Sequence, residues 1–254
     1  MIIASDLLFI MIATVAAAFI LKHTVLGWLG VTPPDTVESL SMPLQQVARV
    51  VADDGNISAE DEQLLSNIID VSSIKDIYDP VISDPVKNAI RDFGNQDYLS
   101  SHKGDFALMY IRTFFKNPMK YVIAWVDGTC GYWNSGYNYW VWFWDIEDNP
   151  YGITRQVASS RLLLVMDEYL WLFYNNPILQ IFTAIGLFVW ICILAFARCI
   201  SDRNTVGIIS IVPILAILLS LLVSSPVYAE FRYMYALFCA LPILLAVTCH
   251  NREV

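Results

Sequence analysis

Residues 224–233, SSPVYAEFRY, form a short polar turn between two long apolar runs. The runs are 206–223 before the turn and 234–247 after it, and a third apolar run, 178–197, precedes both. A helix needs about 20 apolar residues to cross the hydrocarbon core of a bilayer. We therefore predict three closely spaced transmembrane helices, with the turn and its charged residues, Glu230 and Arg232, at a membrane boundary.

Basic residues lie at the opposite ends of these predicted helices. Arg198 and Arg203 lie in the loop after the first helix, and His250 and Arg252 follow the last one. Short segments that carry an excess of Lys and Arg remain in the cytoplasm. The turn at 224–233, and the chain just before residue 178, are therefore expected on the outer face.

The first 31 residues contain a further apolar run and are predicted to form another transmembrane helix. A signal peptide would require basic residues before its apolar run, and residues 1–6 contain none. The flanking charges, Asp6 before the run and Lys22 with His23 after it, would place the N-terminus outside. Four helices and a cytoplasmic C-terminus place it inside, and we follow the signal from the C-terminal helices.

The composition points to a membrane protein with one large region outside the bilayer. Apolar residues make up 57% of the chain, more than in an ordinary soluble domain. Residues 32–177 contain 20 Asp and Glu but 10 Lys and Arg, a net charge of about −10, which excludes nucleic acid as a partner. The fold class predicted is all-α: a helix in 1–31, an extracytoplasmic helical region in 32–177 and a three-helix membrane block in 178–254.

Helix signals recur through residues 32–177. Ser41-Met42-Pro43 begins a helix that ends near Gly55, and Ser58 with Asp61 approximates a capping box for the next one. Asp84-Pro85 opens a helix that ends at Gly94, where we expect a left-handed cap. Asp105 is expected to cap a helix over 106–116, and further helices are predicted over 119–126 and 153–174.

The predicted helices over 106–116 and 119–126 share a basic side, on which Arg112, Lys116 and Lys120 recur every four residues. One interpretation is a helix that lies on the outer leaflet, where its basic side chains meet lipid phosphates. The other is a helix packed on the protein with one solvated side.

Aromatic residues are concentrated in 132–144, where eight of 13 residues are Tyr, Trp or Phe. Tyr and Trp favour the membrane interface, so we place this segment at the level of the lipid headgroups. Exposed Trp rings beside Asp145, Glu147 and Asp148 would also suit a saccharide site, which is the alternative.

Metal and nucleophile motifs are absent from the sequence. The three histidines are isolated, no CxxC pair occurs, and Cys130 is the only cysteine in 32–177, so no metal site or disulfide is predicted there. No phosphate-binding loop or Gly-x-Ser-x-Gly motif is present. The sequence identifies no cofactor.

Several short segments occur in an order that is similar to a known group of proteins. They are SMPLQQVARVV (41–51), YDP (78–80) with SDPVK (83–87), NPMKY (117–121) with GYW (131–133), and AEFRY (229–233). Over residues 40–250 the chain resembles the C-terminal part of large multi-span bacterial membrane proteins, which are in turn similar to glycosyltransferases of the GT-C type.

The resemblance implies a glycosyltransferase-like protein that acts at the outer face on a polyprenyl-phosphate-linked sugar, in the assembly of cell-envelope polysaccharide. In GT-C enzymes the catalytic carboxylate usually lies in the first outer loop, with many spans after it. This chain passes from one predicted span directly to a large outer region. It looks like the C-terminal half of such a protein and is expected to lack the catalytic base.

A polyprenyl-phosphate substrate would need a cation at the outer headgroup level, and Arg232 is suited to it because a guanidinium grips phosphate with two hydrogen bonds. The neighbours expected in the same substrate site are Glu230, Tyr233, Gln45, Gln46 and Arg49. The alternative for Glu230 and Arg232 is an ion pair that anchors the last helix. For Gln45 and Arg49 it is a solvated helix face.

A second function from a different class is a non-catalytic membrane scaffold, whose extracytoplasmic region binds an envelope protein or glycan. A transporter is a weaker interpretation, because the predicted spans lack charges near their centres.

Overall fold

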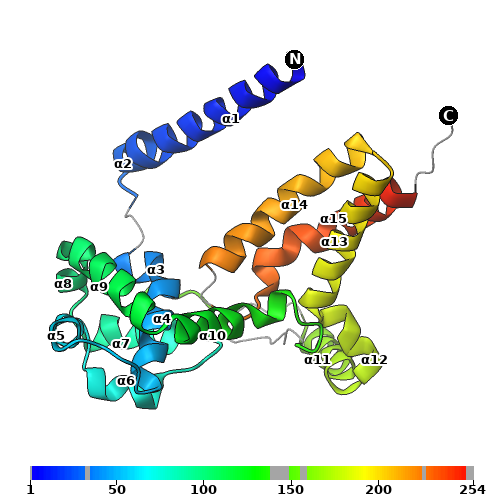
Figure 1. Ribbon diagram of the computed structural model, residues 1–254. Helices are drawn as coiled ribbons and strands as arrows, with labels where there is room; N and C mark the ends of the chain where they lie inside the picture. Colours follow the sequence, from blue (N-terminus) through cyan, green and yellow to red (C-terminus); the bar gives the residue numbers. More distant parts are fainter. Residues whose placement is uncertain (1, 32–34, 138–148, 155–158, 225–226, 250–254) are drawn as a thin grey trace.

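The computed structural model describes residues 2–31, 35–137, 149–154, 159–224 and 227–249 (Figure 1). Within these ranges every named element is a helix, and extended backbone pairs only as isolated bridges. The predicted all-α fold class is confirmed.

Residues 36–129, which contain α3 to α10, form what we call the helical region. It is built around one central helix, α4 (Ser41–Ala52), which contacts α3, α6, α7, α9 and α10. Leu44, Val47 and Val51 face the core of this region, as their helical spacing predicts. The other helices are α3 (Thr36–Ser39), α5 (Ala59–Ser66), α6 (Val71–Ile77), α7 (Asp84–Asp92), α8 (Gln96–Ser101), α9 (Lys103–Lys116) and α10 (Pro118–Thr129), followed by a 3₁₀ turn, η2 (Cys130–Tyr132).

Some helix ends differ from those that the sequence predicts. Ser58 caps α5 as expected, since its hydroxyl accepts a hydrogen bond from the Asp61 amide. Gly94 is not left-handed: an added Cβ there would lie 2.4 Å from the Ile68 carbonyl oxygen, so close packing requires the glycine. Asp105 lies inside the first turn of α9 and does not cap it, because α9 begins at Lys103.

Two helices of the last part of the chain are long and apolar enough to cross a membrane. They are α14 (Thr205–Ser224) and α15 (Phe231–Cys249), and both pack on α13 (Ile185–Ser201). A third span is formed if α13 is joined with the preceding α12 (Pro177–Gln180) and η3 (Ile181–Thr183). The structure therefore supports membrane association.

The third predicted span is not straight. A 62° bend separates residues 177–183 from α13, with Ala184 in extended backbone between them. The start of α13 is held against η2, because the Trp190 indole donates to the Trp133 carbonyl oxygen at 2.6 Å. Gly186 also lies so close to Asn134 that a Cβ would meet the Asn134 backbone at 2.7 Å.

The N-terminal helix is continuous from α1 (Ile2–Ile20) through a π-helical turn, η1 (Leu21–Val25), to α2 (Leu26–Trp28). Its described apolar part, Ile12–Trp28, is shorter than α14 or α15. Over 12–31 the side chains are exposed, with Leu26 half-buried. A span in residues 1–31 stays a prediction.

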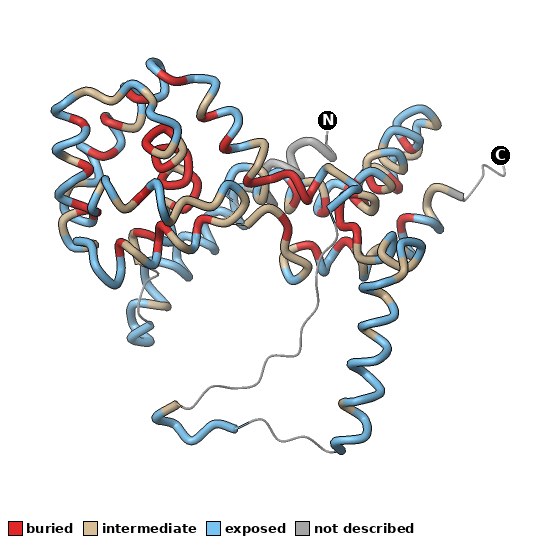
Figure 2. Tube along the Cα trace, turned by 90° about the horizontal axis from the view of Figure 1, so that it is seen from below, coloured by how far each residue is buried: buried red, intermediate tan, exposed pale blue. Residues whose placement is uncertain are grey.

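Buried residues gather in two cores (Figure 2). One lies within the helical region around α4, and the other lies among α13, α14 and α15. Tyr132 is fully buried in the second core, so its ring does not face lipid, and the headgroup level of this segment stays a prediction. Residues Tyr139–Trp144 of the aromatic segment lie outside the described residues.

The helix predicted over 153–174 begins later, as α11 (Ser160–Asn175). Its side chains are exposed or half-buried on every side.

Candidate functional site

The turn before α15 is fixed to the helical region by backbone hydrogen bonds. The Tyr228 amide donates to the Val81 carbonyl oxygen at 2.8 Å, and Ile82 and Val227 form an antiparallel bridge. The Gly131 amide donates to the Tyr228 carbonyl oxygen at 2.9 Å. We call this meeting of residues 81–82, 131 and 227–229 the junction.

The junction leaves no room for a side chain at Gly131. A Cβ at this position would lie 2.3 Å from the Ala229 Cβ and 2.8 Å from the Tyr228 carbonyl oxygen. Two backbone segments therefore meet here directly, and one of them leads straight into α15.

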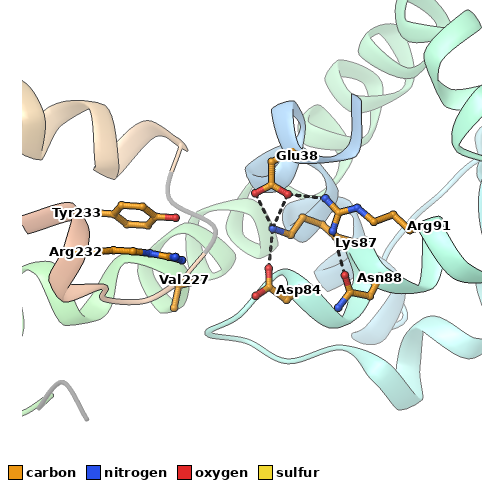
Figure 3. A pocket seen from close by; sticks show the side chains of 8 residues that line it. All are labelled: Glu38, Asp84, Lys87, Asn88, Arg91, Val227, Arg232 and Tyr233. Carbon is orange, nitrogen blue, oxygen red and sulfur yellow. Dashed lines mark hydrogen bonds and ion pairs between the residues drawn. The ribbon is translucent and has the colours of Figure 1, made fainter. Parts of the chain in front are cut away.

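A cavity of about 250 Å³ lies beside the junction, between the helical region and the start of α15 (Figure 3). It has a polar lining from three places in the chain: α3, α7 and the turn with the first residues of α15. The lining residues are Glu38, Asp84, Lys87, Asn88, Arg91, Val227, Arg232 and Tyr233.

Lys87 is the buried cation of this pocket, with only 2% of its side chain exposed. Its ammonium group binds Asp84 at 2.7 Å and both carboxylate oxygens of Glu38 at 3.2 Å. A buried charge is costly unless it is paired, and these carboxylates supply the pairing.

Arg91 completes a charge network behind Lys87. Its Nε donates to Asp35 at 2.8 Å, and its Nη2 donates to Glu38 at 2.6 Å. The hydrogen bond from Arg91 is the main reason that the pKa of Asp35 is lowered. Burial alone would raise the pKa of Glu38, but hydrogen bonds from Arg91 and Lys87 bring it below its ordinary value. Both carboxylates are therefore ionised at neutral pH.

Arg232 is the most exposed cation of the pocket, with 71% of its side chain accessible. It lies across the cavity from Lys87, beside the ring of Tyr233 (Figure 3). Its guanidinium carbon is 5.0 Å from the centre of that ring, and its Nε is 3.6 Å from the Glu230 carboxylate. The pocket lining thus contains three cations and two carboxylates, in contrast to the acidic region around it.

Of the six predicted site residues, Arg232 and Tyr233 line the pocket and Glu230 pairs with Arg232 beside it. Gln45, Gln46 and Arg49 are outside the lining. The predicted solvated face for Gln45 and Arg49 is wrong, because Gln45 is buried at 3% exposure and Arg49 pairs with Asp53 and Asp127 at 2.6 and 2.8 Å.

The two glutamines instead connect parts of the helical region. Gln45 donates to the Asp79 carbonyl oxygen at 2.5 Å, next to the junction. Gln46 donates to the Tyr121 carbonyl oxygen at 3.2 Å and accepts from the Tyr110 hydroxyl at 2.5 Å. Their geometry is that of structural hydrogen bonds, and their role in substrate binding stays a prediction.

Sequence reasoning missed the pocket residues of α7. Asp84, Lys87, Asn88 and Arg91 follow the pattern i, i+3, i+4 and i+7, which places them on one side of a helix. The opposite side carries Val86 and Ile90, which are buried. This spacing was the available signal, but nothing in the sequence placed that side opposite α15.

Within the described residues no group of three or more His, Cys, Asp or Glu side chains could hold a metal ion. The pocket lining includes arginine, lysine, amide and hydroxyl donors, which are the groups that bind an anion directly.

The comparisons with known proteins give a family for the chain. Its sequence matches a family of unknown function, DUF6020, over residues 4–254. No curated protein and no solved structure matches it. The family match neither supports nor refutes the resemblance to GT-C glycosyltransferases. Because the match covers almost the whole chain, this protein belongs to the DUF6020 family.

Proposed function

We propose that this protein is a glycosyltransferase-like membrane protein that binds a polyprenyl-phosphate-linked sugar at the outer face, in the assembly of cell-envelope polysaccharide. The observation that carries the proposal is the pocket at the start of α15, where Arg232 faces a cavity of about 250 Å³ with Lys87 and Arg91 on the other side. Arginine and lysine are the side chains that bind an anionic headgroup such as phosphate.

The chemistry of the lining suits a phosphate group. The Arg232 guanidinium can donate two parallel hydrogen bonds to phosphate oxygens. Tyr233 and Asn88 offer a hydroxyl and an amide for the remaining oxygens or for a sugar hydroxyl. The following turns of α15 are apolar and long enough to enter a membrane, which would place a polyprenyl chain beside them.

The same geometry supports a role in binding, and not in proton transfer, for the two carboxylates of the pocket. Glu38 and Asp84 both bind Lys87, and the lowered pKa of Glu38 makes it a weak general base.

The test is native mass spectrometry of the detergent-purified protein with added polyprenyl phosphate. The matched variants are Arg232→Ala and Arg198→Ala, because Arg198 is also an exposed arginine with an acidic neighbour, Asp202, at 2.7 Å. We expect the lipid to bind the wild type and Arg198→Ala with similar affinity. Its affinity for Arg232→Ala should be at least about tenfold lower, because one charged hydrogen-bonding partner is lost. Equal binding by all three proteins would refute the role of Arg232.

The scaffold function remains the second candidate, and the internal pairing of Lys87 and Arg91 favours it. Two of the three pocket cations are already neutralised by Asp35, Glu38 and Asp84. If the wild type retains no polyprenyl phosphate even in excess, the scaffold becomes the better proposal. The acidic surface of the helical region would then be the place to search for an envelope protein or glycan.

A further inference from the structure

The side of α9 and α10 that faces away from the core of the helical region is apolar. Leu108, Ile111 and Phe115 recur at spacings of three and four residues along α9, and all three are exposed. Met119 and Val122 continue the exposed apolar surface on α10. We call these five residues the apolar face.

Three basic residues of the same two helices bind groups within the protein. Arg112 hydrogen-bonds to Asp61, which is fully buried, and Lys116 lies 3.9 Å from the same carboxylate. Lys120 lies 3.8 Å from Asp53 and donates to its backbone carbonyl oxygen. These three cations are therefore paired within the protein, and their predicted contact with lipid phosphates stays a prediction.

Trp125 connects the apolar face to the membrane helices. Its indole nitrogen donates to the Leu222 carbonyl oxygen at 2.6 Å, in the last turn of α14. That carbonyl is among the four at a helix end that have no partner within the helix. Val122 precedes Trp125 by three residues and is therefore its neighbour on the surface of α10. The apolar face begins where α10 touches the end of a helix that is long enough to cross the membrane.

We propose that α9 and α10 rest on the bilayer, with the apolar face inserted at the interface of the leaflet in which α14 ends. Lipid is the occupant because the face adjoins the end of α14, where the boundary of the bilayer must lie if α14 crosses it. Apolar burial drives the contact, since the surrounding region is acidic and its nearby cations are paired. The proposal is independent of what the pocket binds.

The experiment uses the full chain in nanodiscs of phosphatidylcholine that hold one copy each. A nitroxide label is attached at Phe115→Cys or Met119→Cys, with Glu62→Cys as the control, because Glu62 is exposed on α5. Cys239 and Cys249 are replaced by Ser, whereas Cys130, Cys192 and Cys199 are buried and do not react. The labelled positions are exposed, so the substitutions leave the core intact.

We expect the labels at residues 115 and 119 to be more accessible to oxygen, which concentrates in lipid, than to a water-soluble nickel chelate. The label at residue 62 should show the opposite preference. A water-like result at residue 115 would overturn the proposal. So would a label shielded from both reagents, because in single-copy nanodiscs this would mean contact with another part of the same chain.

A second measurement separates apolar insertion from electrostatic attraction. The label depth at residue 119 should stay the same when phosphatidylglycerol is added and when the salt concentration is raised. Insertion that requires both anionic lipid and low salt would show that the basic residues drive the contact, which contradicts the proposal.

Discussion

At the scale of single residues, three glycines of this protein mark places where one backbone lies against another. Gly94 faces the Ile68 carbonyl, Gly186 faces Asn134, and Gly131 faces Tyr228 and Ala229. None of the three has a positive φ, so each is required by space and not by backbone conformation. The sequence shows a glycine in each case, but only the fold shows which neighbour it must admit.

Replacing Gly131 with Ala is expected to lower the free energy of unfolding by about 1–3 kcal/mol, because the new methyl group overpacks against backbone that cannot move aside. The measurement is the thermal midpoint of the purified protein in detergent. Gly104→Ala is the control, since nothing lies within 4 Å of a Cβ there and alanine favours the helix. An unchanged midpoint for Gly131→Ala would show that the junction yields to accommodate a side chain.

At the scale of helices, the charges on α9 and α10 stabilise their packing on α4 and α5. Burial alone would raise the pKa of Asp61, but hydrogen bonds from Arg112 and Ser58 and the nearby charge of Lys116 lower it. A carboxylate with a lowered pKa stabilises the fold above its unfolded pKa of about 4, and that stabilisation is lost as the pH falls through the lower folded value.

The thermal midpoint should therefore decrease as the pH is lowered below about 4, and Asp61→Asn should weaken this dependence while costing about 2 kcal/mol at neutral pH. Asp76→Asn is the comparison, since the structure gives Asp76 an exposed position on α6. A pH profile for Asp61→Asn that is as steep as that of the wild type would mean that other carboxylates, such as Asp35 and Glu38, control acid unfolding.

Capping and proline motifs in the sequence predicted where helices begin, but they did not predict which distant residues the side chains bind. Ser41-Met42-Pro43, Ser58 and Asp84-Pro85 begin helices as expected, because capping and proline geometry act within one turn. Arg49 binds Asp127, 78 positions away, in addition to Asp53, and Arg112 binds Asp61, 51 positions away. Spacing along one helix contains no information about these distant partners. The pocket could be predicted on its α15 side only, from Glu230 and Arg232, since its α7 side depends on how two distant segments meet.

At the scale of the whole molecule, two cores meet at the junction, and the pocket lies beside it. The loop between α13 and α14 and the helical region lie at opposite ends of the membrane helices (Figure 1). If the helices cross a membrane, this arrangement puts the two on opposite sides of it. That residues 32–177 face outward and the basic loop faces the cytoplasm stays a prediction.

That topology predicts different labelling of two cysteines by a membrane-impermeant maleimide in intact bacterial cells. Glu62→Cys should react directly, whereas Ser201→Cys, exposed at the end of α13, should react only after the cells are permeabilised. Cys239 and Cys249 are replaced by Ser in both variants. The reverse order of labelling would place the helical region in the cytoplasm and remove the basis for an outer-face substrate.

The junction also sets the order in which the protein can be completed during its synthesis. Val81 leaves the ribosome long before its partner Tyr228, roughly 7 to 30 seconds earlier at the usual rates of translation. Throughout this interval the Val81 carbonyl and the Ile82 backbone have no junction partner, while α13 and α14 are still being delivered to the bilayer. The junction and the pocket beside it can therefore form only after the start of α15 has been synthesised.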